Sequence, residues 1–395
     1  MNEWKECTIS DIGMVVGGAT PSTKKPENYE GGDIPWITPK DLSSFNGRYI
    51  SRGNRNITEV GLKSCSTQVL PTHSILFSSR APIGYVAIAQ NQVCTNQGFK
   101  SVVPNEDTDY LFLYYLLKYN KERIEHMGSG TTFKEVSGNT MKEICVKVPT
   151  SIDAQRRIAG VLDAIDSKIE QNEEINKNLL EQALTLYTTQ FSSLEKNGCI
   201  GNYCTVKSGF AFKSSWWTNI GVKVIKIGSI NQDNLNLLEC SYVDEDKVDN
   251  AKDFVVKAGD LLIAMTGATI GKFAMVPYSS EVLLVNQRVG KFFLGNNPVE
   301  KLPFIYCTLK QPEVYGEVVN RGQGSAQPNI SASDIMSIPC VIPSQEAIND
   351  FNDAVQPLFN LIVSNQRENQ QLSELRDTLL PKLMSSELDV SDIDC

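Results

Sequence analysis

The chain has 395 residues, of which 41% are hydrophobic and 21% charged, a balance that excludes a disordered protein and allows two or three domains. No stretch approaches the ~18 consecutive apolar residues of a membrane span, and the first residues lack the layout of a secretory signal, so we expect a cytoplasmic protein without membrane contact. The net charge of -9 falls mainly on residues 151–197 (-3) and 344–395 (-7), whereas residues 1–150 (+1) and 198–343 (0) are close to neutral. The overall acidity therefore does not exclude a nucleic-acid partner.

The first 149 residues predict a mixed domain, with one helical stretch at 111–127 and β-rich runs bounded by Gly, Asn, Pro and Ser. Its loops combine cations with hydroxyl groups, a combination that suits nucleic-acid binding. Arginine can hold guanine through two hydrogen bonds, whereas Ser, Thr and Lys more often contact the backbone. The candidate contacts are Lys24, Lys25, Thr38, Lys40, Ser79, Arg80, Thr131, Thr132 and Lys134. The alternative, that these loops are ordinary solvated connections, stays open for each residue.

A long helix follows at residues 150–196, and a second long helix is predicted at 344–385. Apolar residues recur in both helices at alternating spacings of four and three, a narrow heptad seam that is best buried against a similar seam. We therefore expect the two helices to pair, with Pro357 kinking the early part of the second. The seam is interrupted by paired asparagines at the same relative places, which are Asn172, Asn176, Asn365 and Asn369.

Residues 197–343 predict a second mixed domain, with strands at 222–228 and 289–294. Its loops again carry cations, hydroxyl groups and amides, and Gln and Asn side chains can bind adenine edges. The candidate contacts in this domain are Lys213, Lys226, Ser229, Thr266, Lys272, Gln323, Ser325, Gln327 and Asn329.

The two halves of the chain follow one plan. The segment ILFSSRAPIGYVAI at 75–88 matches LLIAMTGATIGKFAM at 261–275, and a glycine-rich turn at 128–137 matches one at 322–331. Such self-similarity indicates a duplicated unit, and strands grouped apart from helices indicate the α+β class.

Signatures of catalysis are missing from the sequence. The segment TGATIGKF at 266–273 has the wrong glycine spacing for a phosphate loop, so we interpret it as a strand, a turn and a strand. There is no dinucleotide fingerprint, no H-E-x-x-H and no amino-methyltransferase signature, and the ten cysteines are scattered without a C-x-x-C. We expect no metal and no cofactor bound by this chain.

Three segments carry a family resemblance: GGATPSTKKPENYEGGDIPWITPKDL at 17–42, AQRRIAGVLDAIDSKIEQNEEINKNLLEQALTLYTTQF at 154–191 and LSELRDTLLPKLMSSELDV at 372–390. Together they resemble the specificity subunit of type I restriction-modification systems, over essentially the whole chain. The second helix departs from the family pattern at Gln345-Glu346-Ala347 and at Pro357, which puts the shape of its docking surface in question.

The resemblance implies a non-catalytic reader of double-stranded DNA. Two target-recognition domains, residues 1–149 and 197–343, would each read one half of a split site. The helices at 150–196 and 344–385 would form an antiparallel coiled coil with pseudo-twofold symmetry, followed by an acidic tail at 386–395. Two methylation subunits would dock on the coil and supply S-adenosylmethionine, and restriction subunits would supply ATP and Mg. Because the loops of the two domains differ, we expect an asymmetric site.

Two other classes of function stay open. A diverged stand-alone methyltransferase or nuclease would act on DNA without partners. A pure coiled-coil scaffold would leave DNA specificity unchanged when residues 1–149 are exchanged.

The four asparagines lead to a hypothesis about the coil. Buried asparagine costs stability but penalises wrong registers, so these residues are candidates for a register lock that fixes the spacing between half-sites. A slip of one heptad would displace one domain by roughly 10 Å, about three base pairs. The alternative is that the asparagines lie at the margin of the seam and are solvated.

Overall fold

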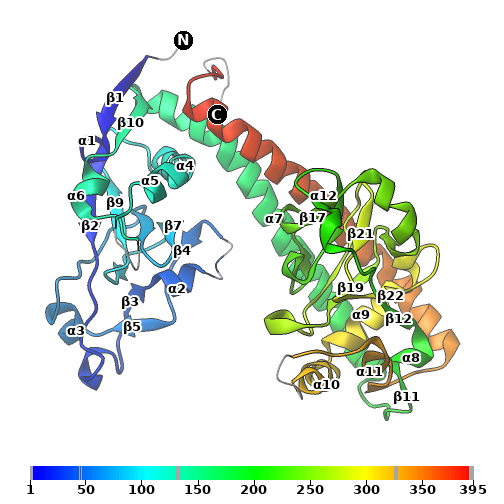
Figure 1. Cartoon of the computed structure of the whole chain (residues 1–395). Coiled ribbons are helices and arrows are strands. Elements are labelled where there is room, and N and C mark those ends of the chain that lie inside the picture. The colour runs from blue at the N-terminus through cyan, green and yellow to red at the C-terminus, as the bar shows by residue number, and fades with distance from the viewer. Residues whose placement is uncertain (1–2, 44, 46, 130–133, 324–327, 391–395) are drawn as a thin grey trace. The chain divides into compact units, whose positions relative to one another are not determined.

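The computed structural model describes residues 3–43, 45, 47–129, 134–323 and 328–390 (Figure 1). The chain divides into two compact units. Unit 1 comprises Met1–Glu170 with Leu372–Cys395, and unit 2 comprises Gln171–Gln371. Among the described residues, no helix is both long enough and apolar enough to cross a membrane.

Unit 1 is built on a five-stranded sheet with the order β2-β9-β6-β7-β4. These strands are Gly13–Gly17, Lys100–Pro104, Ile75–Ser79, Ile83–Ala89 and Tyr49–Ile50. A three-stranded sheet, β5-β3-β8, contains Arg55–Ile57, Ile34–Ile37 and Cys94–Thr95, and β1 (Trp4–Thr8) pairs antiparallel with β10 (Cys145–Pro149). Because β6 is the central strand, all five of its side chains are buried.

Short helices complete unit 1. They are α1 (Ile9–Ile12), α2 (Pro39–Leu42), α3 (Glu59–Lys63), α4 (Tyr110–Tyr119), α5 (Lys121–His126) and α6 (Gly138–Lys142). The sequence predicted one helix where α4 and α5 lie. The break falls at Asn120, whose side-chain amide donates to the carbonyl oxygen of Leu116 at 2.8 Å, so a polar side chain closes the last turn of α4.

Unit 2 repeats the plan with a four-stranded and a five-stranded sheet. The four-stranded sheet, β12-β22-β19-β20, contains Thr205–Ser208, Val289–Phe293, Leu261–Ala264 and Phe273–Met275. The five-stranded sheet, β13-β17-β14-β21-β18, contains Trp217–Thr218, Ser241–Val243, Val222–Ile225, Leu283–Val285 and Val255–Val256. A 3-10 turn at Gly267–Thr269 separates β19 from β20, which confirms the predicted strand, turn and strand.

The smaller elements of unit 2 mirror those of unit 1. The strand β11 (Gly198–Cys199) pairs with β23 (Pro339–Cys340), and β15 (Ile230–Asn231) pairs with β16 (Asn234–Leu235). The helices are α8 (Ile200–Tyr203), α9 (Leu302–Lys310), α10 (Pro312–Gly322) and α11 (Ala332–Met336). The α+β class is therefore confirmed.

Two helices of 40 residues, α7 (Ile152–Phe191) and α12 (Gln345–Met384), contribute to both units. Inside each unit they run antiparallel and in contact (Figure 1). In unit 1, Asp166 of α7 accepts a hydrogen bond from Arg376 of α12 at 2.8 Å. In unit 2, Asn172 donates to Asn369 at 2.8 Å and Asn365 donates to Asn176 at 2.9 Å. Residue numbers rise on one helix as they fall on the other, which confirms the predicted pairing.

Two details of the long helices bear on the sequence predictions. Pro357 is exposed and α12 continues through it as helix, because Val355 and Phe359 on either side are buried in the core of unit 2. Near the end of α7 the heptad spacing predicts that Leu186 and Gln190 face the seam, but the buried residues are Tyr187 and Phe191. A straight helix of 3.6 residues per turn drifts away from a 3.5-residue seam, and here it turns two aromatic rings onto the domain.

A polar contact fixes the helices to the domain in each unit. In unit 1, the Arg48 guanidinium pairs with Asp163 and, at 2.7 Å, with Glu170 of α7. In unit 2, Asp233 pairs with Lys310 of α9, and its carbonyl oxygen accepts from Gln366 of α12 at 3.2 Å.

Candidate nucleic-acid interface

In both units a glycine lies so close to the backbone at the end of a strand that no side chain would fit there. A Cβ atom at Gly18 would lie 2.2 Å from the carbonyl oxygen of Thr95, and a Cβ atom at Gly209 would lie 2.4 Å from that of Val285. The residue after each glycine donates its backbone N–H to the same oxygen, at 3.1 Å in unit 1 and 2.8 Å in unit 2. Only glycine permits this contact, so each glycine joins an N-terminal loop to the strand end opposite it.

An asparagine turn follows that strand end in each unit. The Asn96 side-chain oxygen accepts from the backbone N–H of Gly98 at 2.8 Å, and the Asn286 oxygen accepts from that of Arg288 at 3.3 Å. Asn96 and Asn286, each followed by a glutamine in the sequence, are therefore turn-forming residues, and each closes a local loop through its own side chain.

Two further loop segments in each unit are held by equivalent backbone hydrogen bonds. Ser79 N–H donates to Gly98 at 2.7 Å, and Met265 N–H donates to Arg288 at 3.0 Å. The carbonyl oxygens of Ser79 and Met265 accept from the backbones of Val136 and Ile330 at 3.0 and 2.9 Å. Four loop segments thus meet in each unit. We define the first junction as residues 17–25, 78–82, 95–100, 128–129 and 134–137, and the second junction as residues 208–216, 264–268, 285–290, 322–323 and 328–331.

The first junction has a cationic surface. Lys24, Lys25 and Lys134 are exposed. The side chain of Arg80 is 34% exposed and lies 3.6 Å from the Glu135 carboxylate, to which Lys100 also contributes an ion pair at 3.3 Å. Lys100 was missed by the sequence interpretation because it stands at the start of an apolar strand. The predicted Thr131 and Thr132 lie outside the described residues.

Two hydroxyl predictions of the first domain need correction. Ser79 is fully buried at the end of β6, and its Oγ donates to the carbonyl oxygen of Gly98 at 3.1 Å, so it cannot contact a ligand in this conformation. Thr38 is half-buried at the N-cap of α2, where the Asp41 carboxylate accepts from its backbone N–H at 2.8 Å and from its Oγ1 at 2.7 Å. Lys40, in the first turn of α2, remains exposed.

The second junction is more aromatic. Lys213 is exposed, and its ammonium lies 5.4 Å from the centroid of the Trp216 ring. Outside the second junction, Lys226 directly follows β14 and places its ammonium 3.6 Å from the centroid of the Trp217 ring, and burial lowers the pKa of Lys226. Ser229 is fully buried and donates to the carbonyl oxygen of Glu239 at 3.2 Å, so its predicted role is also wrong.

The polar side chains of the second junction lie on the turn that follows β19 and on the loop that pairs with it. Thr266 is half-buried, forms a backbone bridge with Asn329, and has no hydrogen-bond partner for its Oγ1 among the described residues. Gln323 and Asn329 are exposed and Lys272 is half-buried. Ser325 and Gln327 lie outside the described residues. Both junctions therefore offer hydrogen-bonding groups, held on backbone that is fixed in the same way.

Three of the four seam asparagines are buried, so the alternative that they are solvated at the margin of the seam does not hold for these three. Asn172, Asn176 and Asn365 are 1%, 9% and 7% exposed, and Asn369 is half-buried. Asn172 also donates to Glu368 at 2.7 Å. These amides bind one another across α7 and α12 inside unit 2, as a register lock requires.

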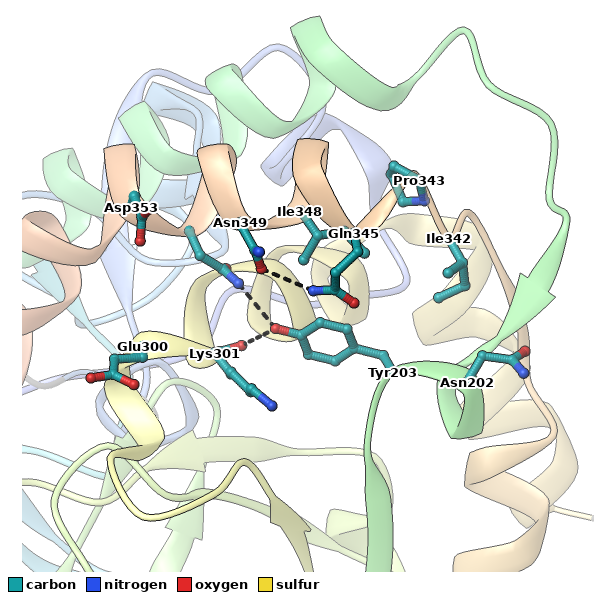
Figure 2. Close-up of a pocket in the computed structure, with 11 residues that line it drawn as sticks. Asn202, Tyr203, Glu300, Lys301, Ile342, Pro343, Gln345, Ile348, Asn349 and Asp353 are labelled. Atoms are coloured by element: carbon teal, nitrogen blue, oxygen red, sulfur yellow. Dashed lines mark hydrogen bonds between the residues drawn. The ribbon is translucent and has the colours of Figure 1, made fainter.

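A polar pocket of unit 2 lies apart from the second junction, at the start of α12 (Figure 2). Its centre is the Tyr203 hydroxyl, which donates to the carbonyl oxygen of Lys301 at 2.7 Å and accepts from Asn352 at 3.1 Å. Asn352 in turn accepts from the backbone of Phe304 at 2.9 Å. These groups bind one another and fix α12 to α9, so the pocket is a structural joint.

No group of three or more His, Cys, Asp or Glu side chains among the described residues could hold a metal ion. The cysteines within these residues are unpaired, and burial raises the pKa of Cys204 and Cys340 to about 12. Such thiols stay protonated near neutral pH and are poor ligands and nucleophiles.

The two junctions indicate a protein built from two similar domains, and comparison with known proteins identifies its family. The family model for the type I restriction modification DNA specificity domain matches residues 1–181 and, a second time, residues 195–374. The chain belongs to this family, and it is a DNA specificity subunit with two target-recognition domains in tandem.

Relatives and solved structures agree with this assignment. The type I restriction enzyme MjaIX specificity subunit of Methanocaldococcus jannaschii is 34% identical over 418 residues, covering 99% of this chain and 95% of the relative. The MjaVIII specificity subunit of the same organism is 21% identical, covering 99% of this chain and 94% of the relative. The crystal structure of a type I restriction-modification S subunit from M. genitalium has the same fold, with a TM-score of 0.58 at 18% identity over 97% of this chain and 96% of that chain.

Proposed function

We propose that the chain is a non-catalytic subunit whose two junctions each read one half of an asymmetric, bipartite site in double-stranded DNA. The observation that carries this proposal is the repetition of the same backbone hydrogen bonds in both junctions with different side chains on them. A common scaffold with different polar groups suits two binding sites of one kind and of different sequence preference. The reading domains are residues 1–149 and 197–343.

The paired helices set the spacing between the half-sites and dock two methylation subunits. The amide contacts between α7 and α12 support the first role, because they fix the register. Exposed apolar side chains on the helices support the second, since Ile175, Leu186, Leu361 and Leu375 are all more than 40% exposed. The methylation subunits supply S-adenosylmethionine, and restriction subunits supply ATP and Mg in the full complex, which acts on cytoplasmic DNA.

The test is to map methylated adenines in cells that carry this chain together with its methylation subunits. Arg80→Ala is expected to relax one base-pair position of one half-site at a cost of about 1–3 kcal/mol, because arginine can bind guanine through two hydrogen bonds. Lys134→Ala is expected to weaken all sequences alike, because an exposed ammonium most readily contacts phosphate.

Two controls separate the alternatives. Methylation subunits without the chain should show no bipartite site, and the purified chain alone should neither methylate nor cut DNA. Unchanged methylation in both the Arg80 and the Lys134 variants would show that the first junction has been assigned wrongly.

A further inference from the structure

Each junction contains one arginine, but on different segments. In the sequences of the four segments, Arg80 is the single arginine of the first junction and Arg288 that of the second. Arg80 follows β6, whereas Arg288 lies in the asparagine turn before β22. These two segments are hydrogen-bonded neighbours in each unit, through Ser79 and Gly98 in unit 1 and through Met265 and Arg288 in unit 2. The arginine therefore stands on one segment in the first junction and on the neighbouring segment in the second.

Packing explains why the first junction cannot hold its arginine in the asparagine turn. Gly98 occupies the place of Arg288, and a Cβ atom there would lie 2.7 Å from Cγ of Pro39 and 2.9 Å from Oδ1 of Asn96. A proline ring cannot rotate away, so position 98 admits no side chain without moving α2. In the second junction the corresponding backbone carries Arg288, with its N–H bound to Asn286.

The two arginines also differ in the partners of their guanidinium groups. The backbones of Arg80 and Glu135 form an isolated β-bridge, and the Arg80 guanidinium forms an ion pair with the Glu135 carboxylate. The matching bridge in unit 2 joins Thr266 to Asn329, which carries no charge. Arg288 is exposed, and its side chain has no ion pair or hydrogen bond to any residue that the structure describes. It is thus a cation with free donors on a backbone that is fixed to Met265 by a hydrogen bond of 3.0 Å.

We infer that Arg288 is the guanine-reading residue of the second target-recognition domain. A guanidinium on a fixed backbone can donate two parallel hydrogen bonds to N7 and O6 of guanine in the major groove, whereas lysine cannot reproduce that planar fork. The inference rests on the proposed function and adds a requirement to it, namely that the half-site read by unit 2 contains a G·C pair.

The experiment compares methylated-adenine maps for the full chain carrying Arg288→Lys, Arg288→Ala or Arg80→Ala, each expressed with the methylation subunits. Both Arg288 variants should lose at least about tenfold of the preference for one G·C pair in one half-site, while the other half-site and the spacer stay unchanged. Arg80→Ala should alter the opposite half-site. Lys257→Ala, an exposed cation of unit 2 outside the junction, should change nothing.

Three results would overturn the inference: a second half-site without a G·C pair, an unchanged consensus in Arg288→Ala, or a uniform loss of methylation that Arg288→Lys restores. The last result would assign Arg288 to phosphate. Failure of the proposed function is distinguishable, because the unmutated complex would then methylate no bipartite sequence. Denaturation midpoints should match the parent chain, since the exposed side chain makes no hydrogen bond or ion pair within the described residues.

Discussion

At the scale of single residues, the backbone of each junction depends on one glycine. Gly18→Ala and Gly209→Ala should each destabilise their unit by about 1–3 kcal/mol or more, because the added methyl would meet carbonyl oxygens at 2.2 and 2.4 Å that are fixed in strands. Chemical denaturation measures this change. Gly17→Ala is the matched control, since a Cβ atom at Gly17 meets nothing within 4 Å. Equal stability of the Gly17 and Gly18 variants would contradict the close approach.

The same scale shows where sequence interpretation fails. Residue types in loops predicted the exposed cations, including Lys24, Lys134 and Lys213. They did not predict direction: Ser79 and Ser229 look like polar loop residues, yet both point inward and bind backbone carbonyls. A hydroxyl can be buried when it satisfies one carbonyl, whereas a buried ammonium needs a counter-ion, as Lys291 has in Asp260, so exposure is easier to predict for cations than for hydroxyls.

At the scale of elements, the spacing of apolar residues predicted both long helices and their pairing, because a narrow seam has few other ways to be buried. It could not predict that Tyr187 is buried in place of Leu186, because this depends on an aromatic cluster whose members are distant in the sequence. Tyr187 lies 5.7 Å from Phe304 and Phe351 between ring centroids, and neither partner is near it in sequence.

The buried amide pair of Asn176 and Asn365 gives a quantitative test at this scale. Asn365→Leu alone should cost about 1–3 kcal/mol, because it leaves the Asn176 oxygen buried without its donor. The double variant with Asn176→Leu should recover most of this loss or exceed the parent stability, since two apolar side chains suit the seam. Denaturation of all four proteins gives the coupling energy, expected at about 1–2 kcal/mol.

The exposed Asn178→Leu on α7 serves as control and should change stability by less than about 0.5 kcal/mol. Additive effects of the two buried substitutions would show that the amides do not interact. A more stable double variant that also accepts a wider range of spacers would support the register lock, since stability and spacing stringency would then have been separated.

At the scale of the whole molecule, the duplication was predictable because turn glycines, asparagines and strand cores repeat at a nearly constant offset. The junction was only partly predictable. Arg288 was not among the predicted contacts, because its counterpart in the first half of the chain is Gly98, which has no side chain. The equivalence emerges from hydrogen bonds between Met265 and Arg288 and between Ser79 and Gly98, which join segments distant in sequence.

The division of the chain predicts how a domain exchange must be made. Residues 1–149 form the proposed first reading domain, but Arg48 binds Asp163 and Glu170, which lie on α7 beyond that boundary. Exchanging residues 1–149 with a related subunit therefore risks leaving two carboxylates without their cation. Exchanging Met1–Glu170 together with Leu372–Cys395 keeps each such contact within one parent.

The larger exchange should accordingly unfold at a higher denaturant concentration than the smaller one. Methylated-adenine maps of both chimeras, made with the methylation subunits, should show one half-site replaced and the other retained, because the second junction and the asparagine contacts between α7 and α12 are untouched. Restoring a basic residue at position 48 of the smaller chimera should recover its stability without altering its half-site. A chimera in which both half-sites change would show that the domains do not read DNA independently, and one in which neither changes would favour a scaffold without a role in DNA recognition.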